Sequence, residues 1–153
     1  MISTERVRQL LDPTYVGSLG ARSLDDLRDM KVECNDVENA LSYLRRLAQA
    51  RIEILQAESD RRAQGGSVGD LVRDLPRILS AESGRSTIAD TRVPPPDAPA
   101  VELHWPDGRE ELASTLERLR DFERELSESR RGLHGVIDTI EREIAARQVA
   151  GTT

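Results

Sequence analysis

Five polar residues recur twice along the chain at the same spacing, and their side chains are of kinds that bind ligands. The steps between them are four, three, four and four residues in both copies, and the second copy lies 85 residues after the first throughout. The first copy comprises Glu38, Ser42, Arg45, Gln49 and Glu53, and the second comprises Glu123, Ser127, Arg130, His134 and Asp138. Three positions are identical, one keeps its carboxylate, and one changes from glutamine to histidine. We call these ten residues the polar repeat.

On a helix, each copy would present its five side chains from one face, because at about 100° per residue they span an arc of about 80°. Carboxylates accept hydrogen bonds from the N1–H and N2–H₂ groups of guanine. Arginine donates two parallel bonds to guanine O6 and N7 or to phosphate, and its plane stacks on bases. Serine and glutamine add further hydrogen bonds. Acid and arginine together suit a guanine nucleotide better than a bare phosphate, and a repeated set suits a two-fold ligand.

Two long helices are expected to position the two copies. The first predicted helix, 24–63, contains no glycine or proline, and Ser23 and Asp26 are placed as a capping box at its start. The second predicted helix is 107–147, and its residues 109–131 also contain no glycine or proline. Apolar residues recur in heptads on both helices, at Leu27, Met30, Cys34, Val37, Leu41, Leu44, Ala48 and Leu55, and at Leu112, Leu116, Leu119, Leu126, Leu133, Ile137, Ile140 and Ile144. The sequence therefore predicts an all-α fold in which two long helices form an antiparallel coiled coil. The connection is also long enough for parallel pairing, which stays open.

The rest of the chain is expected to complete a single helical domain, 1–153. We predict a short helix over 4–11, stopped by Asp12-Pro13, and a loop over 12–22. A second short helix is predicted over 67–79, where Pro76 could break it. The segment 80–106 is rich in Ser, Gly and Pro and is predicted to be a flexible linker.

The polar repeat interrupts both hydrophobic seams. Glu123 and Arg130 share a heptad position with Leu116 and Ile137, and a charge at such a position costs stability unless it is paired. For any one of these residues, the simpler interpretation is a solvated charge or a cross-link between helices. The recurrence of five positions in register favours a binding site.

Composition narrows the classes of function. The net charge of −6 argues against direct nucleic-acid binding and against an anionic membrane surface. The single cysteine, Cys34, forms no internal disulfide and is expected to be a small buried apolar residue, and no Cys/His set has zinc spacing. No segment resembles a signal peptide or approaches the ~20 apolar residues of a membrane span. We expect a cytoplasmic, non-enzymatic protein, since no catalytic set, phosphate loop or metal site is present.

The paired motif resembles the signature of the RsiG family, actinobacterial anti-sigma factors that bind cyclic di-GMP. The family motif, E-x3-S-x2-R-x3-Q-x3-D, occurs once on each of two coiled-coil helices. This chain has E-x3-S-x2-R-x3-Q-x3-E at 38–53 and E-x3-S-x2-R-x3-H-x3-D at 123–138. The resemblance covers the two long helices, and five spaced positions found twice make it fairly specific.

The resemblance implies that two cyclic di-GMP molecules, as a partly intercalated dimer, lie against both motifs. The loaded protein would then sequester a WhiG-type sigma factor and repress sporulation genes. Glu53 departs from the family aspartate and His134 from the family glutamine. Since imidazole donates or accepts one bond where an amide does both, we expect the second motif to differ from the first in affinity or in its response to pH.

Two other classes of function compete with this interpretation. One is a structural or adaptor coiled coil without a small ligand, and a less favoured one is a phosphodiesterase-like enzyme. Arg46 and Arg131 also match at the repeat offset, and we interpret them as solvated helix arginines rather than auxiliary phosphate contacts. His104 and Trp105 are interpreted as a hydrophobic staple at a helix start rather than an anchor for a partner.

Overall fold

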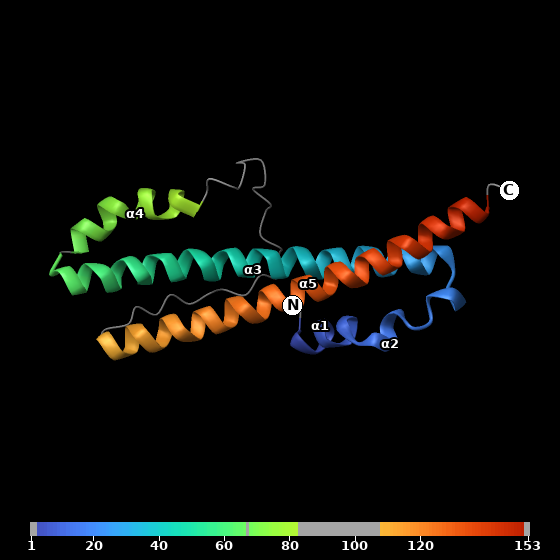
Figure 1. Ribbon diagram of the computed structural model, residues 1–153, viewed down its shortest axis with the longest axis horizontal. Helices are drawn as coiled ribbons and strands as arrows, with labels where there is room; N and C mark the ends of the chain where they lie inside the picture. The colour runs from blue at the N-terminus through green and yellow to red at the C-terminus, as the bar shows by residue number, and fades with distance from the viewer. Residues whose placement is uncertain (1–2, 67, 83–107, 152–153) are drawn as a thin grey trace.

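The computed structural model describes residues 3–66, 68–82 and 108–151, and within these ranges the regular structure is entirely helical (Figure 1). The elements are α1 (Thr4–Leu11), α2 (Pro13–Val16), a 3₁₀ turn η1 (Leu19–Ala21), α3 (Leu24–Gln64), α4 (Val68–Glu82) and α5 (Arg109–Ala150). Two of them, α3 and α5, are far longer than the others and pack against each other along the molecule.

The first long helix begins and ends where its sequence signals stand. Ser23 Oγ accepts a hydrogen bond from the backbone N–H of Asp26 at 3.1 Å, and the Asp26 carboxylate accepts one from the N–H of Ser23 at 3.1 Å, which confirms the capping box. Gly65 has φ of 71°, a left-handed conformation that glycine adopts at little cost, and α3 ends there.

The two long helices run antiparallel, as predicted. Lys31, near the start of α3, forms an ion pair with Glu141 near the end of α5 at 2.7 Å. At the opposite end, the Arg109 guanidinium donates to the backbone carbonyl of Arg62 at 3.3 Å. Residue numbers therefore rise along one helix as they fall along the other, and the long connection returns the chain to the start of α5.

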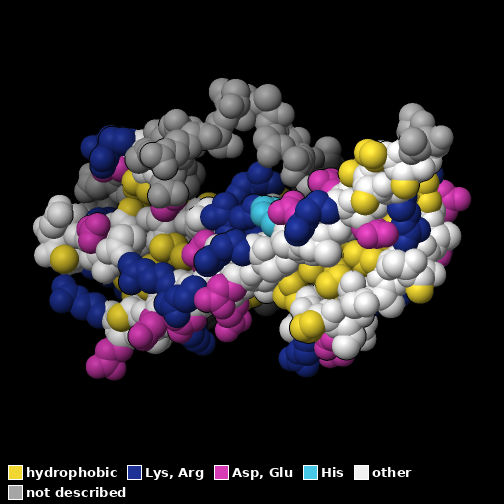
Figure 2. All heavy atoms as spheres, turned by 45° about the vertical axis from the view of Figure 1, so that its right-hand side comes forward, with side chains coloured by type: hydrophobic (Ala, Val, Ile, Leu, Met, Phe, Trp, Pro, Cys, Tyr) yellow, Lys and Arg dark blue, Asp and Glu magenta, His cyan; other side chains and the backbone are white. Residues whose placement is uncertain are grey.

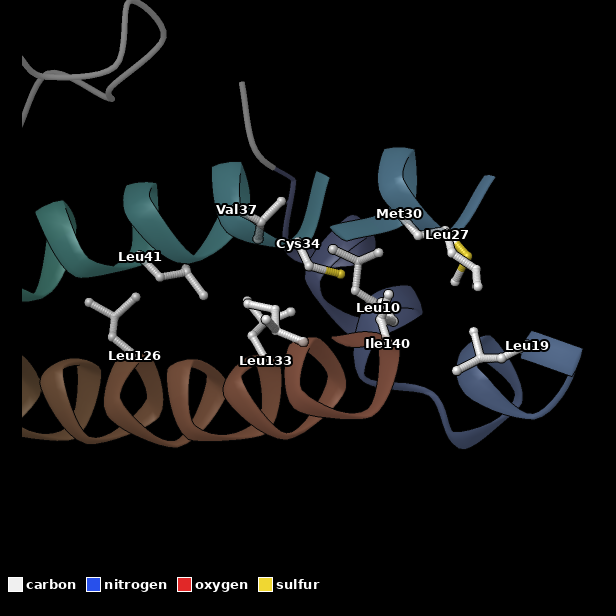
Figure 3. Close-up of a cluster of buried hydrophobic side chains, with 11 residues drawn as sticks. Leu10, Leu19, Leu27, Met30, Cys34, Val37, Leu41, Leu126, Leu133 and Ile140 are labelled. Atoms are coloured by element: carbon white, nitrogen blue, oxygen red, sulfur yellow. The ribbon is translucent and has the colours of Figure 1, made fainter. Parts of the chain in front are cut away.

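The hydrophobic seam is divided into two clusters along α3 and α5. The larger lies toward the N-terminal half of α3 and contains Leu10, Leu19, Leu27, Met30, Cys34, Val37, Leu41, Leu126, Leu133, Ile137 and Ile140. The smaller lies toward the other end and contains Leu55, Leu112 and Leu116. Figure 3 shows Leu41 and Leu126 facing each other between the two helices at one edge of the larger cluster. The heptad residues named from the sequence are thus buried, apart from Leu44, Leu119 and Ile144, which are partly buried.

The N-terminal segment folds back against α5, and here one prediction was wrong. Residues 12–22 were expected to form a loop, but they contain α2 and η1. Asp12 accepts a hydrogen bond from the N–H of Thr14 at 2.8 Å and Pro13 occupies the first turn, so the signal that ends α1 also starts α2. Leu10 and Leu19 bring this segment into the larger hydrophobic cluster.

The helix after the glycine pair is longer than predicted. Pro76 lies inside α4 and does not end it, and residues 80–82, which were assigned to the linker, continue the helix. Leu71 is buried where α4 packs on α3. The remainder of the predicted linker, with His104 and Trp105, falls outside the described residues.

Candidate functional site

Most of the polar repeat meets across the α3–α5 interface, partly alongside the larger hydrophobic cluster and partly between it and the smaller one. Its residues do not form one site per motif. Instead, the carboxylate and serine of each motif meet the arginine and the fourth residue of the other motif across the α3–α5 interface. The result is two mixed clusters, each of which takes two residues from each helix.

The first of these, the Glu38 cluster, contains Glu38 and Ser42 of α3 and Arg130 and His134 of α5. Two donors reach the same oxygen, Glu38 Oε1: Ser42 Oγ at 2.7 Å and Arg130 Nε at 3.0 Å. His134 Nε2 lies 3.2 Å from it. The Glu38 side chain is only 13% exposed. Burial alone would raise the pKa of Glu38, but the hydrogen bonds from Ser42 and Arg130 and the positive charge of Arg130 outweigh it, and the pKa lies below its ordinary value.

The second, the Glu123 cluster, contains Glu123 and Ser127 of α5 and Arg45 and Gln49 of α3. Ser127 Oγ donates to Glu123 Oε1 at 2.8 Å, and Gln49 Nε2 donates to the same oxygen at 3.4 Å. The guanidinium of Arg45 pairs with this oxygen through Nη1 at 3.6 Å. The carboxylate again accepts from its own helix and from the facing one.

The two clusters are related by a local two-fold symmetry. Exchanging the helices, with the 85-residue offset applied to each residue, turns the Glu38–Arg130 contact into Glu123–Arg45 and the His134–Glu38 contact into Gln49–Glu123. The symmetry follows from an antiparallel pair of helices that carry the same motif, because each motif then meets the other in reverse order. The repeated motif in the sequence therefore gives two equivalent sets of contacts in the structure.

The last residue of each motif lies outside these clusters. Asp138 is exposed on α5. Glu53 lines a groove of about 680 Å³ between α3 and α4, together with apolar residues that include Ile52, Leu71 and Ile78. The structure therefore brings together eight of the ten residues singled out from the sequence, and Glu53 and Asp138 border them on their own helices.

Sequence reasoning did not identify which residues would pair across the helices, nor two features beside the clusters. Gly132, between Arg130 and His134, is where Leu11 of α1 closely approaches α5, since a Cβ there would lie 2.6 Å from Leu11 Cδ2. Glu58, 1% exposed, accepts hydrogen bonds from Arg61 and Arg62, and Arg61 also donates to the carbonyl of Gly66. A glycine inside a heptad pattern and an acid followed by arginines at three and four residues were the available signals.

The surface around the clusters is polar and carries charges of both signs. Figure 2 shows Lys, Arg, Asp and Glu side chains gathered around a histidine in the middle of the molecule, with hydrophobic side chains on both sides. The part of the chain that the structure describes contains no group of three or more side chains suited to hold a metal ion. None of its helices is both long and apolar enough to cross a membrane. Paired guanidinium, carboxylate, hydroxyl and amide groups are suited to recognising a polar, anionic ligand.

Comparison with known proteins places this geometry in a family. The model of the RsiG-like family matches residues 13–79 and 108–153, which include both long helices and both copies of the polar repeat. Neither a curated protein nor a solved structure is significantly similar to the chain.

Proposed function

The chain belongs to the RsiG-like family of anti-sigma factors, and from this premise we propose that it binds cyclic di-GMP at the two mixed clusters. When loaded, it would sequester a WhiG-type sigma factor and so repress sporulation genes. The observation that carries the proposal is the two-fold pairing of the motifs, in which the carboxylate of each motif meets the arginine of the other across the helices.

The chemistry of each cluster supports a guanine nucleotide. Each holds a carboxylate, which accepts the N1–H and N2–H₂ donors of guanine, beside an arginine, which donates to O6 and N7 or to phosphate. The local two-fold symmetry matches a pair of ligand molecules related by a two-fold axis. We therefore propose two cyclic di-GMP molecules, one for each cluster, with Glu53 and Asp138 at the outer ends.

Ligand entry requires that the ion pairs within the clusters open. Arg45 and Glu123 are 28% and 24% exposed, and Arg130 is 23% exposed. Opening a mostly buried ion pair loses the stabilisation that each charge gives the other. An anionic ligand can offset this loss, because it supplies acceptors for the arginines and donors for the glutamates.

The direct test is a calorimetric titration of cyclic di-GMP into the purified chain, with GTP and cyclic di-AMP as controls. We expect saturable binding of about two molecules per chain, specific to cyclic di-GMP. Arg45→Gln and Arg130→Gln should weaken binding while helicity is retained. Arg124→Gln, an exposed arginine of α5 that pairs with Asp121, is the matched control and should bind as the wild type does.

Capture of the sigma factor is tested separately, by mixing the chain with a purified WhiG-type sigma factor with and without cyclic di-GMP. We expect a complex that depends on the nucleotide and is lost in Arg45→Gln. If no cyclic di-GMP binds even when the sigma factor is present, the proposed ligand is wrong.

A structural or adaptor function is the alternative, and one observation favours it. In each cluster the carboxylate, serine and arginine contact one another, so these contacts could serve only to fix the register of the two helices. An adaptor predicts that Arg45→Gln and Arg130→Gln leave partner binding unchanged. It also predicts equal or greater stability for variants in which apolar residues replace the pairs.

A further inference from the structure

The two mixed clusters hold matching residues, but their contacts differ in length. In the Glu38 cluster, Ser42 and Arg130 donate to one carboxylate oxygen at 2.7 and 3.0 Å, and His134 Nε2 lies 3.2 Å from the same oxygen. In the Glu123 cluster, only Ser127 is as close, and the contacts of Gln49 and Arg45 measure 3.4 and 3.6 Å. The first cluster is therefore held by three short contacts, and the second by one.

The two arginines also differ in the state of their Nε groups. Arg130 Nε donates to Glu38, whereas the equivalent Nε of Arg45 is buried and has no hydrogen-bond partner among the described residues. A buried donor without an acceptor is unfavourable, because it has lost its bond to water and gained none in return. A ligand acceptor that reached Arg45 would restore that bond, and the same acceptor at Arg130 would have to displace one.

We propose that the two clusters load in order, the Glu123 cluster first, with Arg45 as the residue that makes the initial contact with the nucleotide. This rests on the proposed function. A ligand must break the existing contacts of a cluster before it can bind. The contacts of Glu123 with Arg45 and Gln49 are longer than those of Glu38, and Arg45 Nε has no acceptor among the described residues to give up. The Glu38 cluster opens for the second molecule, with lower affinity.

His134 is the residue by which the two clusters differ in composition. It is the one position of the repeat at which the two motifs carry different chemical groups, imidazole in place of the amide of Gln49. Its Nε2 lies 3.2 Å from the same Glu38 oxygen that accepts from Arg130, a shorter distance than the 3.4 Å between Gln49 and Glu123. Restoring the amide should make the two clusters more alike.

The first experiment needs no ligand and compares stability. Urea unfolding is measured for Glu38→Gln, Arg130→Gln and their double variant, and for Glu123→Gln, Arg45→Gln and theirs. We expect the coupling between Glu38 and Arg130 to exceed that between Glu123 and Arg45, and Arg130→Gln to lower the urea midpoint more than Arg45→Gln. Equal couplings, or a larger one for Glu123 and Arg45, would overturn the inferred difference.

The second experiment titrates cyclic di-GMP into the wild type, Arg45→Gln, Arg130→Gln, His134→Gln and the control Arg124→Gln. We expect two binding steps in the wild type. Arg45→Gln should weaken the first step tenfold or more, Arg130→Gln should weaken mainly the second step, and His134→Gln should bring the two affinities closer. Circular dichroism on each variant shows whether the helices remain folded.

The outcomes separate the ordered loading from the proposed function. If cyclic di-GMP binds but Arg45→Gln and Arg130→Gln weaken the first step equally, the order is wrong and the proposed function stands. If the order is reversed, with Arg130→Gln the more damaging, the inference is likewise overturned. If the wild type binds no cyclic di-GMP, the proposed function fails and the order of loading fails with it.

Discussion

Arg130 of α5 donates from Nε to Glu38 of α3 at 3.0 Å, so the arginine of the second motif neutralises the carboxylate of the first. Either charge alone would destabilise the coiled coil, because it lies at a position that interrupts a hydrophobic seam. Because the motif is repeated on antiparallel helices, the same solution occurs a second time between Arg45 and Glu123. Charged residues are thus tolerated inside the coiled coil, because each is paired with a residue of the facing helix.

The low pKa of Glu38 predicts sensitivity to acid. The pKa of Glu38 is lower in the folded protein than in the unfolded one, where it is about 4.3. Such a carboxyl group stabilises the fold at pH values above its unfolded-state pKa, and this stabilisation is lost as the pH falls through its folded-state pKa. We expect the free energy of unfolding in urea to decrease below about pH 5. For Glu38→Gln, the free energy of unfolding should decrease less steeply with falling pH. Glu125→Gln, a change at an exposed residue, is the control for the loss of one carboxylate. Identical slopes for the wild type and Glu38→Gln would contradict the prediction.

Two glycines of α5 provide a test of how the N-terminal segment docks. Open space surrounds the position that an alanine methyl group would take at Gly135, so Gly135→Ala should raise the free energy of unfolding by about 0.5–1 kcal/mol through helix propensity alone. Gly132→Ala would place its Cβ 2.6 Å from Leu11 Cδ2, so the Leu11 side chain must move, and we expect α1 to pack less closely on α5. We expect Gly132→Ala to be less stable than Gly135→Ala and to speed tryptic cleavage at Arg6 and Arg8. Equal stability of the two variants would show that α1 does not pack against Gly132.

The elements could be predicted from the sequence because local signals define them. Heptads and the Ser23 cap identify α3, and the face that each motif occupies follows from its spacing. Pairing across the helices could not be predicted, because a periodic pattern fixes the face of a helix but not its register against another. The antiparallel register that places Arg130 against Glu38 is set by packing of apolar residues far apart in the chain. The short helices after Asp12 were not predicted, because the segment is short and contains glycine and proline, which usually indicate a loop.

The buried carboxylate of Glu58 predicts a strong local effect at the end of α3. Hydrogen bonds from Arg61 outweigh burial and, with those from Arg62, lower the pKa of Glu58. Replacing it by glutamine removes the buried carboxylate that accepts hydrogen bonds from both arginines, and breaking such a buried pair costs about 3 kcal/mol. Glu58→Gln should therefore lower the urea midpoint and speed amide exchange in the last turns of α3. Asp60→Asn, an exposed change two residues further on, should do neither.

Exchanging the charges of one cluster distinguishes ligand recognition from a purely structural pair. Arg130→Glu alone places a second carboxylate opposite Glu38, so the free energy of unfolding should fall. Adding Glu38→Arg restores an opposite-charge pair at the same place, and we expect urea unfolding to show recovery of most of the lost stability. Binding of cyclic di-GMP should stay impaired in the double variant, because donor and acceptor have exchanged positions relative to the guanine.

The same double variant addresses the adaptor alternative directly. A coiled coil that acts only through its shape requires an intact pair and does not distinguish which helix carries the arginine. Partner binding would then return together with stability. For a nucleotide-dependent anti-sigma factor, stability returns and nucleotide-dependent capture of the sigma factor does not, because the ligand molecule at the Glu38 cluster must still find its carboxylate on α3 and its guanidinium on α5. A double variant that regained wild-type affinity for cyclic di-GMP would show that these two residues are not ligand contacts.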